Sequence, residues 1–321
     1  WTVETRAIIS SGQYVFAGTD MLGVFKSSNN GATFSMSNTG LTSAWIQAFT
    51  IFDGKLFSGS GEEGVFISVD AGSSWNPINT GLGSLNITSL ASDDVNIYAG
   101  TSDTGIYFSN DLGVNWLTLN TGLISLEITS LESSNNFLFA GTKNNGLFKS
   151  SNQGVSWQQV SNGVPSQANI RCIYSYDSLL FVGTGTGKVF TSDDYGNTWY
   201  LLDNGLTGAP VLSLWVFEDY LYAGMNAGGV WKYPLSMILE INKIKDKANF
   251  YIYPVPSNKN ITVVTNKMHD PSYITIYSTI GQELIRKKIK ENITQIDISA
   301  LTPGIYLIVY KNDEGNVFTK K

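Results

Sequence analysis

The eight residues SNDLGVNW at positions 109–116 are one copy of a motif, Ser-x-Asp/Asn-x-Gly-x-x-Trp/Phe, that occurs five times in this chain of 321 residues. The other copies are SSNNGATF at 27–34, SVDAGSSW at 68–75, SSNQGVSW at 150–157 and SDDYGNTW at 192–199. Successive copies begin 41, 41, 41 and 42 residues apart. A fixed period of this size is typical of repeated supersecondary units that bury their faces by stacking on one another.

The defining positions of the motif carry residues that suit a tight turn. Glycine supplies a positive φ angle, and an Asp or Asn side chain accepts hydrogen bonds from nearby backbone N–H groups. We therefore expect a structural role for them, with the acids dispersed on separate turns and the final aromatic packed into its unit. The positions are Ser27, Asn29, Gly31 and Phe34; Ser68, Asp70, Gly72 and Trp75; Ser109, Asp111, Gly113 and Trp116; Ser150, Asn152, Gly154 and Trp157; and Ser192, Asp194, Gly196 and Trp199.

Each unit contains four short apolar segments separated by turn signals, which predicts four strands. Four antiparallel strands in about 40 to 45 residues are typical of one blade of a β-propeller. In the third unit the predicted strands are 87–91, 96–101, 105–110 and 115–119.

A sixth unit begins at Val211 and stops at Tyr233, before its fourth strand. The sequence therefore predicts an all-β fold with a six-bladed propeller over residues 1–233, in which residues 1–3 supply the missing strand. If the chain starts within the propeller, a seventh blade precedes Trp1 instead.

The first strand of every unit places a small residue beside a large apolar one, a pattern that allows neighbouring blades to interlock. The only cysteine, Cys172, occupies one of the small positions and is interpreted as a packing residue. The small residues are Ala7, Ala48, Ser89, Ser130, Cys172 and Ser213, and the large ones are Ile8, Phe49, Leu90, Leu131, Ile173 and Leu214.

Composition excludes several classes of function. Residues 1–233 carry 8 Lys+Arg and 18 Asp+Glu, which argues against a nucleic-acid surface. With one cysteine and one histidine, His269, the chain has no intramolecular disulfide, no cysteine-based metal cluster and no multi-histidine zinc site, and residues 1–233 cannot carry Ser-His-Asp or Cys-His catalysis. We expect no cofactor, no metal and no catalytic residue. No apolar run approaches the 18 residues of a membrane span.

The eight-residue motif resembles the Asp-box, or BNR repeat, of sialidases, sortilin-type receptors, some xyloglucanases and photosystem assembly factors. The sialidase resemblance implies three arginines that bind the substrate carboxylate, whereas residues 1–233 contain only Arg6 and Arg171. The xyloglucanase resemblance implies paired aspartates across two propellers, and this chain has length for one. A sialidase-like or other glycoside hydrolase is therefore the alternative hypothesis.

Arg6 and Arg171 occupy the same repeat position, near the start of the first strand of the first and fifth units. Such strand ends lie at the mouth of a propeller channel, so the pair is a candidate site for a carboxylate or sulfate. Alternatively, each arginine pairs with an acid of a neighbouring blade. Other candidate ligand-binding residues lie on loops of the same face, where carboxylates beside an aromatic suit sugar binding. They are Trp45, Asp20, Glu62, Glu63, Asp103 and Lys143.

Beyond Tyr233 the glycine-rich period ends. Residues 234–249 are predicted to form a linker. Residues 250–321 show a different pattern of short apolar segments and turns, which predicts a small immunoglobulin-like β-sandwich. Its seven predicted strands are 250–253, 261–265, 273–277, 283–287, 293–297, 305–310 and 317–320.

This segment resembles the type A sorting domain of the type IX secretion system of Bacteroidota. The resemblance is carried by Tyr253-Pro254-Val255-Pro256, Ile274-Thr275-Ile276-Tyr277 with Gly281-Gln282, Ile296 to Leu301, Pro303-Gly304-Ile305-Tyr306 and the final Lys320-Lys321. It implies that residues 250–321 engage the secretion machinery, and that the protein crosses the periplasm and is then released or held at the outer-membrane surface.

Together these observations favour a secreted or cell-surface β-propeller that binds a glycan or a protein and performs no chemistry. A scaffold role is a third hypothesis, but it calls for a basic surface patch that 8 Lys+Arg supply poorly.

Overall fold

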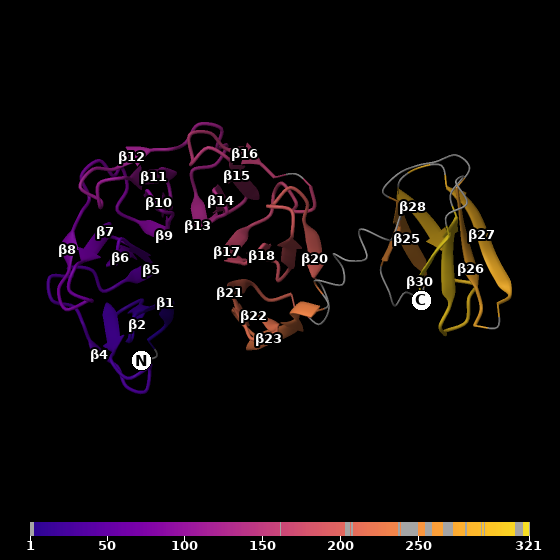
Figure 1. The fold of residues 1–321 in the computed structure, drawn as a ribbon, viewed down its shortest axis with the longest axis horizontal. Helices are drawn as coiled ribbons and strands as arrows, with labels where there is room; N and C mark the ends of the chain where they lie inside the picture. Colours follow the sequence, from indigo (N-terminus) through magenta and orange to yellow (C-terminus); the bar gives the residue numbers. More distant parts are fainter. Residues whose placement is uncertain are drawn as a thin grey trace. The chain divides into compact units, whose positions relative to one another are not determined.

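A computed structural model of the chain describes residues 3–160, 162–202, 206, 208–236, 238, 250–253, 259–265, 272–279, 281–289, 291, 293–311 and 317–320. The chain divides into two compact units, Trp1–Leu235 and Ser236–Lys321. In the described residues, 30 strands form eight antiparallel sheets, so the predicted all-β class is confirmed (Figure 1).

The first unit holds six sheets, each built from strands that follow one another along the chain (Figure 1). The first three sheets contain β1 (Thr5–Ser11), β2 (Tyr14–Thr19), β3 (Val24–Ser27) and β4 (Ser35–Met36); β5 (Ile46–Phe52), β6 (Lys55–Ser60), β7 (Val65–Ser68) and β8 (Asn76–Pro77); and β9 (Ile87–Ser92), β10 (Ile97–Thr101), β11 (Ile106–Ser109) and β12 (Leu117–Thr118). The next three contain β13 (Ile128–Ser134), β14 (Phe137–Thr142), β15 (Leu147–Ser150) and β16 (Gln158–Gln159); β17 (Ile170–Tyr176), β18 (Leu179–Thr184), β19 (Val189–Ser192) and β20 (Tyr200–Leu202); and β21 (Val211–Phe217), β22 (Tyr220–Met225) and β23 (Val230–Pro234).

The six sheets follow one another around an arc, with the first strand of each sheet innermost (Figure 1). Each innermost strand contacts the next one along the chain, from β1 through β5, β9, β13 and β17 to β21. Four-stranded antiparallel sheets in this order are the blades of a β-propeller, as the 41-residue period predicts.

A glycine on the second strand of a sheet lets the next sheet approach closely. A Cβ added to Gly59 would lie 2.6 Å from Ile87 Cγ2, and one added to Gly100 would lie 2.6 Å from Ile128 Cγ2. These approaches are too short for any side chain, so glycine is required where a large inner-strand residue of the next sheet packs. Besides the small residues predicted on the innermost strands, a glycine on the second strand therefore also makes room for a large residue of the next sheet.

The sixth sheet has three strands in the part of the chain that the structure describes. Val3 belongs to no strand, and Trp1 and Thr2 lie outside the described residues. Closure by residues 1–3 and the number of blades therefore stay predictions.

The second unit contains all seven predicted strands in two sheets. Ile261 and Val263 of one sheet pack with Ile274, Ile276 and Tyr310 of the other, which makes the core of a sandwich. The immunoglobulin-like topology stays a prediction, and most of the predicted linker 234–249 lies outside the described residues. The first sheet contains β24 (Phe250–Tyr253), β25 (Asn260–Thr265) and β28 (Ile293–Asp297), and the second contains β27 (Glu283–Ile289), β26 (Ser272–Tyr277), β29 (Leu307–Lys311) and β30 (Val317–Lys320).

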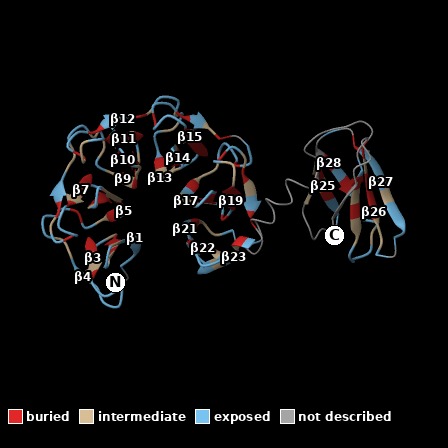
Figure 2. Ribbon diagram, viewed as in Figure 1, coloured by how far each residue is buried: buried red, intermediate tan, exposed pale blue. Residues whose placement is uncertain are grey.

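Burial follows the repeat. Buried positions concentrate in the strands, whereas the turns between them are mostly exposed (Figure 2). The second strands are the most completely buried, and β10 and β18 are buried at every position. Turns therefore make up much of the exposed surface of the propeller.

Candidate functional site

The repeated motif forms the turn between the third and fourth strands of the first five sheets. In the second copy, Ser68 Oγ donates to Asp70 Oδ1 at 2.8 Å and accepts from the Gly72 N–H at 2.7 Å, while Asp70 Oδ1 accepts from the Ser74 N–H at 2.8 Å. Gly72 adopts a φ of +79°, and a Cβ there would lie 2.3 Å from the Phe16 ring. Only glycine fits this position.

The same hydrogen bonds occur in the copies with Asn. Ser27 Oγ donates to Asn29 Oδ1 at 2.9 Å, and Ser150 Oγ donates to Asn152 Oδ1 at 2.8 Å. An acid is therefore not needed for this turn, because an amide oxygen accepts the same bonds.

The acids of the motif are engaged within their own turns. Hydrogen bonds from the Ser74 side chain and backbone lower the pKa of Asp70 to about 2. The backbone and side chain of Asn115 lower the pKa of Asp111 in the same way. A carboxylate held in its ionised form by neighbouring donors is a poor general acid. These observations support a structural interpretation of both residues.

The tryptophan that ends the motif contacts the preceding sheet. Trp116 Nε1 donates to Ile78 O at 2.7 Å, and the Trp116 N–H donates to Thr80 O at 2.9 Å. Trp75 and Trp157 make the equivalent bonds to carbonyl groups 38 residues earlier in the chain. The motif thus joins neighbouring sheets as well as closing a turn.

One pocket of about 500 Å³ lies where the innermost strands of all six sheets meet. The same repeat position of each strand lines it: Arg6, Gln47, Thr88, Thr129, Arg171 and Leu212. We call this hollow the axial pocket. It brings together the two arginines singled out by the sequence, although they are 165 positions apart.

The two arginines differ in their surroundings. Arg6 Nη2 lies 2.7 Å from Glu4 Oε2 and 3.8 Å from Asp20 Oδ2, so acids of its own sheet neutralise it. Arg171 is exposed and forms no ion pair with any described residue. Arg171 therefore offers a free guanidinium at the pocket.

The polar residues between the arginines are partly occupied by the fold. Thr88 Oγ1 donates to Ile128 O at 2.7 Å, Thr129 Oγ1 donates to Ile170 O at 2.6 Å, and Gln47 Nε2 donates to Asn86 Oδ1 at 3.0 Å. These bonds join successive innermost strands and fix the side chains that line the pocket. A hydroxyl whose hydrogen is donated still has lone pairs for a ligand.

The remaining candidate residues do not line the axial pocket. Glu62, Glu63 and Asp103 lie on turns between second and third strands, and Lys143 Nζ lies 3.6 Å from Glu127 Oε1. Trp45 covers Gly61, and its indole Nε1 is buried without a hydrogen-bond partner among the described residues.

A buried carboxyl group between innermost strands was missed by sequence reasoning. Glu132 of β13 accepts hydrogen bonds from the Ser175 N–H at 3.1 Å and from Ser175 Oγ of β17. The residue is partly exposed, but its carboxyl group is enclosed, and this burial raises the pKa of Glu132 to about 7. The signal available in the sequence is an acid at an inner-strand position where the other units carry apolar residues or threonine.

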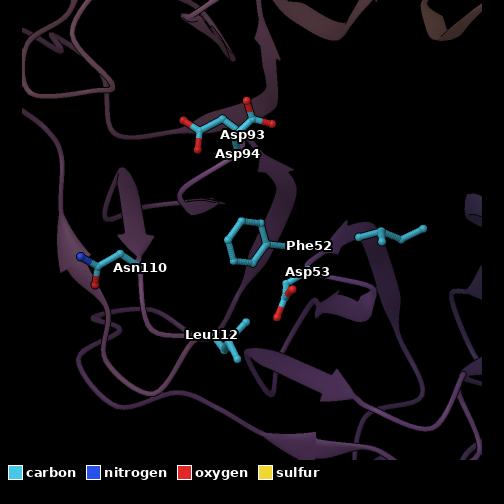
Figure 3. Close-up of a pocket in the computed structure, with 7 residues that line it drawn as sticks. Phe52, Asp53, Asp93, Asp94, Asn110 and Leu112 are labelled. Atoms are coloured by element: carbon cyan, nitrogen blue, oxygen red, sulfur yellow. The ribbon is translucent and has the colours of Figure 1, made fainter.

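A second hollow of about 600 Å³ lies between the second and third sheets. Figure 3 shows the Phe52 ring between the Asp93–Asp94 turn and Leu112, with Asp53 nearby. Asp93 accepts from the N–H groups of residues 95 and 96 and from Tyr98 Oη, and Asp53 pairs with Lys55 Nζ at 2.5 Å. Two of the three carboxylates are thus committed to protein contacts.

Two further classes of site were sought in the described residues. No group of three His, Cys, Asp or Glu side chains there is arranged to hold a metal ion. No helix in that part of the chain is both long enough and apolar enough to cross a membrane.

Residues 251–321 match the family described as the secretion system C-terminal sorting domain. This match agrees with the type IX resemblance, and it shows export through the periplasm to the cell surface or the medium. No curated protein matches the chain.

Solved structures share the fold at low sequence identity. YCF48 bound to D1 peptide is 12% identical, with a TM-score of 0.57 over 72% of this chain and 79% of that one. PorZ, a surface component of the type IX secretion system of Porphyromonas gingivalis, is 15% identical, with a TM-score of 0.54 over 98% and 50%. The GH74 enzyme of Niastella koreensis is 15% identical, with a TM-score of 0.56 over 72% and 36%. At these identities the likeness establishes a β-propeller fold and nothing about ligands.

Proposed function

We propose that the chain is an exported binding protein whose propeller holds an anionic group of a glycan or a protein in the axial pocket. The observation that carries this proposal is Arg171, a guanidinium without a carboxylate partner among the described residues, in a pocket to which all six innermost strands contribute. A guanidinium binds carboxylate or sulfate through two parallel hydrogen bonds. Threonine and glutamine oxygens that line the same pocket suit the hydroxyl groups of a sugar.

The charge of the rest of the propeller sharpens this expectation. Residues 1–233 are acidic overall, with 18 Asp+Glu against 8 Lys+Arg, so an anionic ligand gains little from long-range attraction. Affinity for an anion then depends on the local site, and chiefly on Arg171. Arg6 contributes less, because Glu4 and Asp20 already neutralise it.

The test is binding of the whole chain to an array of carboxylated, sulfated and neutral glycans and to acidic peptides. The strongest anionic ligand is then titrated against Arg171→Gln and Arg6→Gln, with Lys143→Gln as a matched control outside the pocket. We expect Arg171→Gln to weaken binding at least tenfold, which corresponds to about 1.4 kcal/mol, Arg6→Gln to weaken it less, and Lys143→Gln to leave it unchanged. Equal binding by all three variants contradicts the proposal.

A glycoside hydrolase is the second candidate, and the hollow beside Phe52 is the observation that favours it. Three carboxylates line that hollow, and glycosidases use a carboxylate pair in one pocket. Hydrolysis of sialidase or glucanase substrates, abolished by Asp94→Asn, would support the enzyme over the binding protein. We expect no turnover, because Asp93 and Asp53 are already engaged by protein donors.

A further inference from the structure

Every sheet-to-sheet contact in the propeller uses the same two faces. The forward face of a sheet carries the glycine of its second strand, and the rear face of the next sheet places a large inner-strand residue on that glycine. At Gly59 this residue is Ile87, with Leu90 beside it, and their atoms would lie 2.6 and 3.4 Å from an added Cβ. At the other four glycines, Gly18, Gly100, Gly141 and Gly183, the residues are Ile46, Ile128, Ile170 and Val211. Each interface therefore consists of one forward face, with the glycine, and one rear face, with the large residue, and both faces can be recognised in any sheet.

The forward face of the sixth sheet has no such neighbour. An added Cβ on Gly224, the equivalent glycine, meets only the Ser213 side chain of its own sheet within 4 Å. Val230 is 68% exposed, whereas the five residues at its repeat position are completely buried. Trp215, on the innermost strand of this sheet, is 62% exposed. The five buried equivalents are Val24, Val65, Ile106, Leu147 and Val189.

The rear face of the first sheet is equally uncovered. Ile8 is 70% exposed, whereas Leu90, Leu131, Ile173 and Leu214 at its repeat position are each 7% exposed. Phe34, which ends the first motif, is 43% exposed, whereas the tryptophans of the other four copies are almost fully buried. The first sheet thus leaves Ile8 and Phe34 exposed at two positions whose equivalents are buried or nearly so in other sheets, and no described residue covers them.

The two uncovered faces lie at opposite ends of one arc. Figure 1 shows β1 and β21 as its ends, separated by an opening. Because Ile8 and Val230 are both exposed, the first and sixth sheets do not bury these faces against each other. We call the opening between them the gap.

We propose that the gap is a docking site for one further four-stranded unit of the same repeat. Such a unit has a rear face for Gly224 and Val230 and a forward face for Ile8, so it satisfies both ends at once. The assignment continues an interface that the chain already builds five times. A second copy fits less well, because five further sheets would follow the first sheet that it places on Gly224.

The occupant is defined chemically by this continuity. It carries large aliphatic residues at the positions of Ile87 and Leu90, to cover the glycine of the sixth sheet. Its second strand carries a glycine to receive Ile8. A unit with these properties is present in the chain as residues 86–126, which is the third repeat.

The test appends a copy of residues 86–126 directly before Glu4, in place of residues 1–3. In the extended chain Leu126 of the copy is followed by Glu4. This reproduces the Leu126–Glu127 junction of the natural sequence, because Glu127 and Glu4 occupy the same repeat position. The matched control carries aspartate at the positions of Ile87 and Leu90 in the appended copy only. The exposure of Trp215 is measured by iodide quenching of tryptophan fluorescence. The contribution of Trp215 is the part of the quenching that disappears when the same protein carries Trp215→Phe.

We expect the appended unit to raise the melting temperature and to protect Trp215 from iodide, and the control to do neither. Trp215 that remains as accessible with the added unit as without it would overturn the proposal. So would a dimer of the unmodified chain in which Trp215 is already protected, since a second copy would then occupy the gap.

A second measurement on the unmodified chain does not depend on the appended unit folding. Val230→Asn should leave the melting temperature unchanged, whereas Val65→Asn at the equivalent buried position should lower it strongly. Equal destabilisation by both substitutions would mean that the gap is already filled, and the proposal would be wrong.

Discussion

Replacing Glu132 by glutamine should stabilise the propeller at neutral pH and leave it unchanged in acid. Burial of the carboxyl group raises the pKa of Glu132 to about 7 from an ordinary value of 4.5. A raised carboxyl pKa means that the folded state binds the proton more tightly than the unfolded state does. Stability from this group is therefore fully present below pH 4.5 and is lost as the pH rises to 7.

The magnitude follows from the size of this difference. One pKa unit corresponds to about 1.36 kcal/mol, so ionising Glu132 costs the folded state up to about 3 kcal/mol above pH 7. Glutamine keeps the shape and the acceptor oxygen Oε1, to which the Ser175 N–H and Oγ both donate. The substitution therefore removes the ionisation and keeps both hydrogen bonds.

The assay is urea denaturation of Glu132→Gln and of the unsubstituted chain at pH 5 and pH 8. All eight tryptophans lie in the first unit, so tryptophan fluorescence follows the unfolding of the propeller alone. The difference between the two chains should be small at pH 5 and should approach 3 kcal/mol at pH 8. Glu62→Gln, at an exposed glutamate, is the control and should differ little at either pH. A difference that is the same at both pH values would refute the reasoning, because it would mean that Glu132 does not titrate between them.

Three other outcomes rest on contacts of the central sheets. Trp116→Phe removes the indole N–H that donates to Ile78 O and should lower the unfolding free energy by about 1–3 kcal/mol. An unchanged unfolding free energy in urea denaturation would mean that this hydrogen bond does not stabilise the propeller. Gly81→Ala, whose Cβ would lie 2.3 Å from Trp116 O, should lower the melting temperature more than Gly54→Ala, whose Cβ meets nothing within 4 Å, and equal losses would show that positive φ alone decides. Cys172 is partly exposed as a residue, but its thiol is enclosed beside Val211 O, and this burial raises the thiol pKa to about 12. A disulfide reagent at pH 8 should therefore label it only in denaturant, and rapid labelling of the folded chain argues against this environment.

The strands were predictable because their signals are local. Alternating apolar residues, bounded by glycine and asparagine turns, placed the third sheet at 87–119 and all seven strands of the second unit close to where the structure has them. Equivalent repeat positions also indicated that Arg6 and Arg171 approach a common axis. Because the repeat has a fixed period, the position of a residue within its unit predicts where it lies relative to the axis. The approach of these two arginines could therefore be predicted without knowledge of any tertiary contact.

Contacts between residues distant in the chain were harder to predict. The alternative expectation for Arg6 was an acid of a neighbouring blade, but its partners are Glu4 and Asp20, which directly precede β1 and follow β2 of the same unit. Pairing of Thr5 with Thr19 brings these residues together at one end of β1 and β2, and that register is not visible in the composition of either strand. The enclosed carboxyl of Glu132 depends in the same way on a partner strand about 43 residues away.

The indole bonds from three of the motif tryptophans to the preceding sheet also indicate an order of assembly. For Trp75, Trp116 and Trp157 the acceptor carbonyl, such as Ile78 O, lies 38 residues before the indole that donates to it, whereas the Trp199 indole donates to Gly196 O of its own turn. A segment emerging from a membrane channel, amino end first, therefore always meets a completed template with its carbonyl groups already in position. Such a chain can consolidate stepwise, without waiting for its last residue, which suits an exported protein.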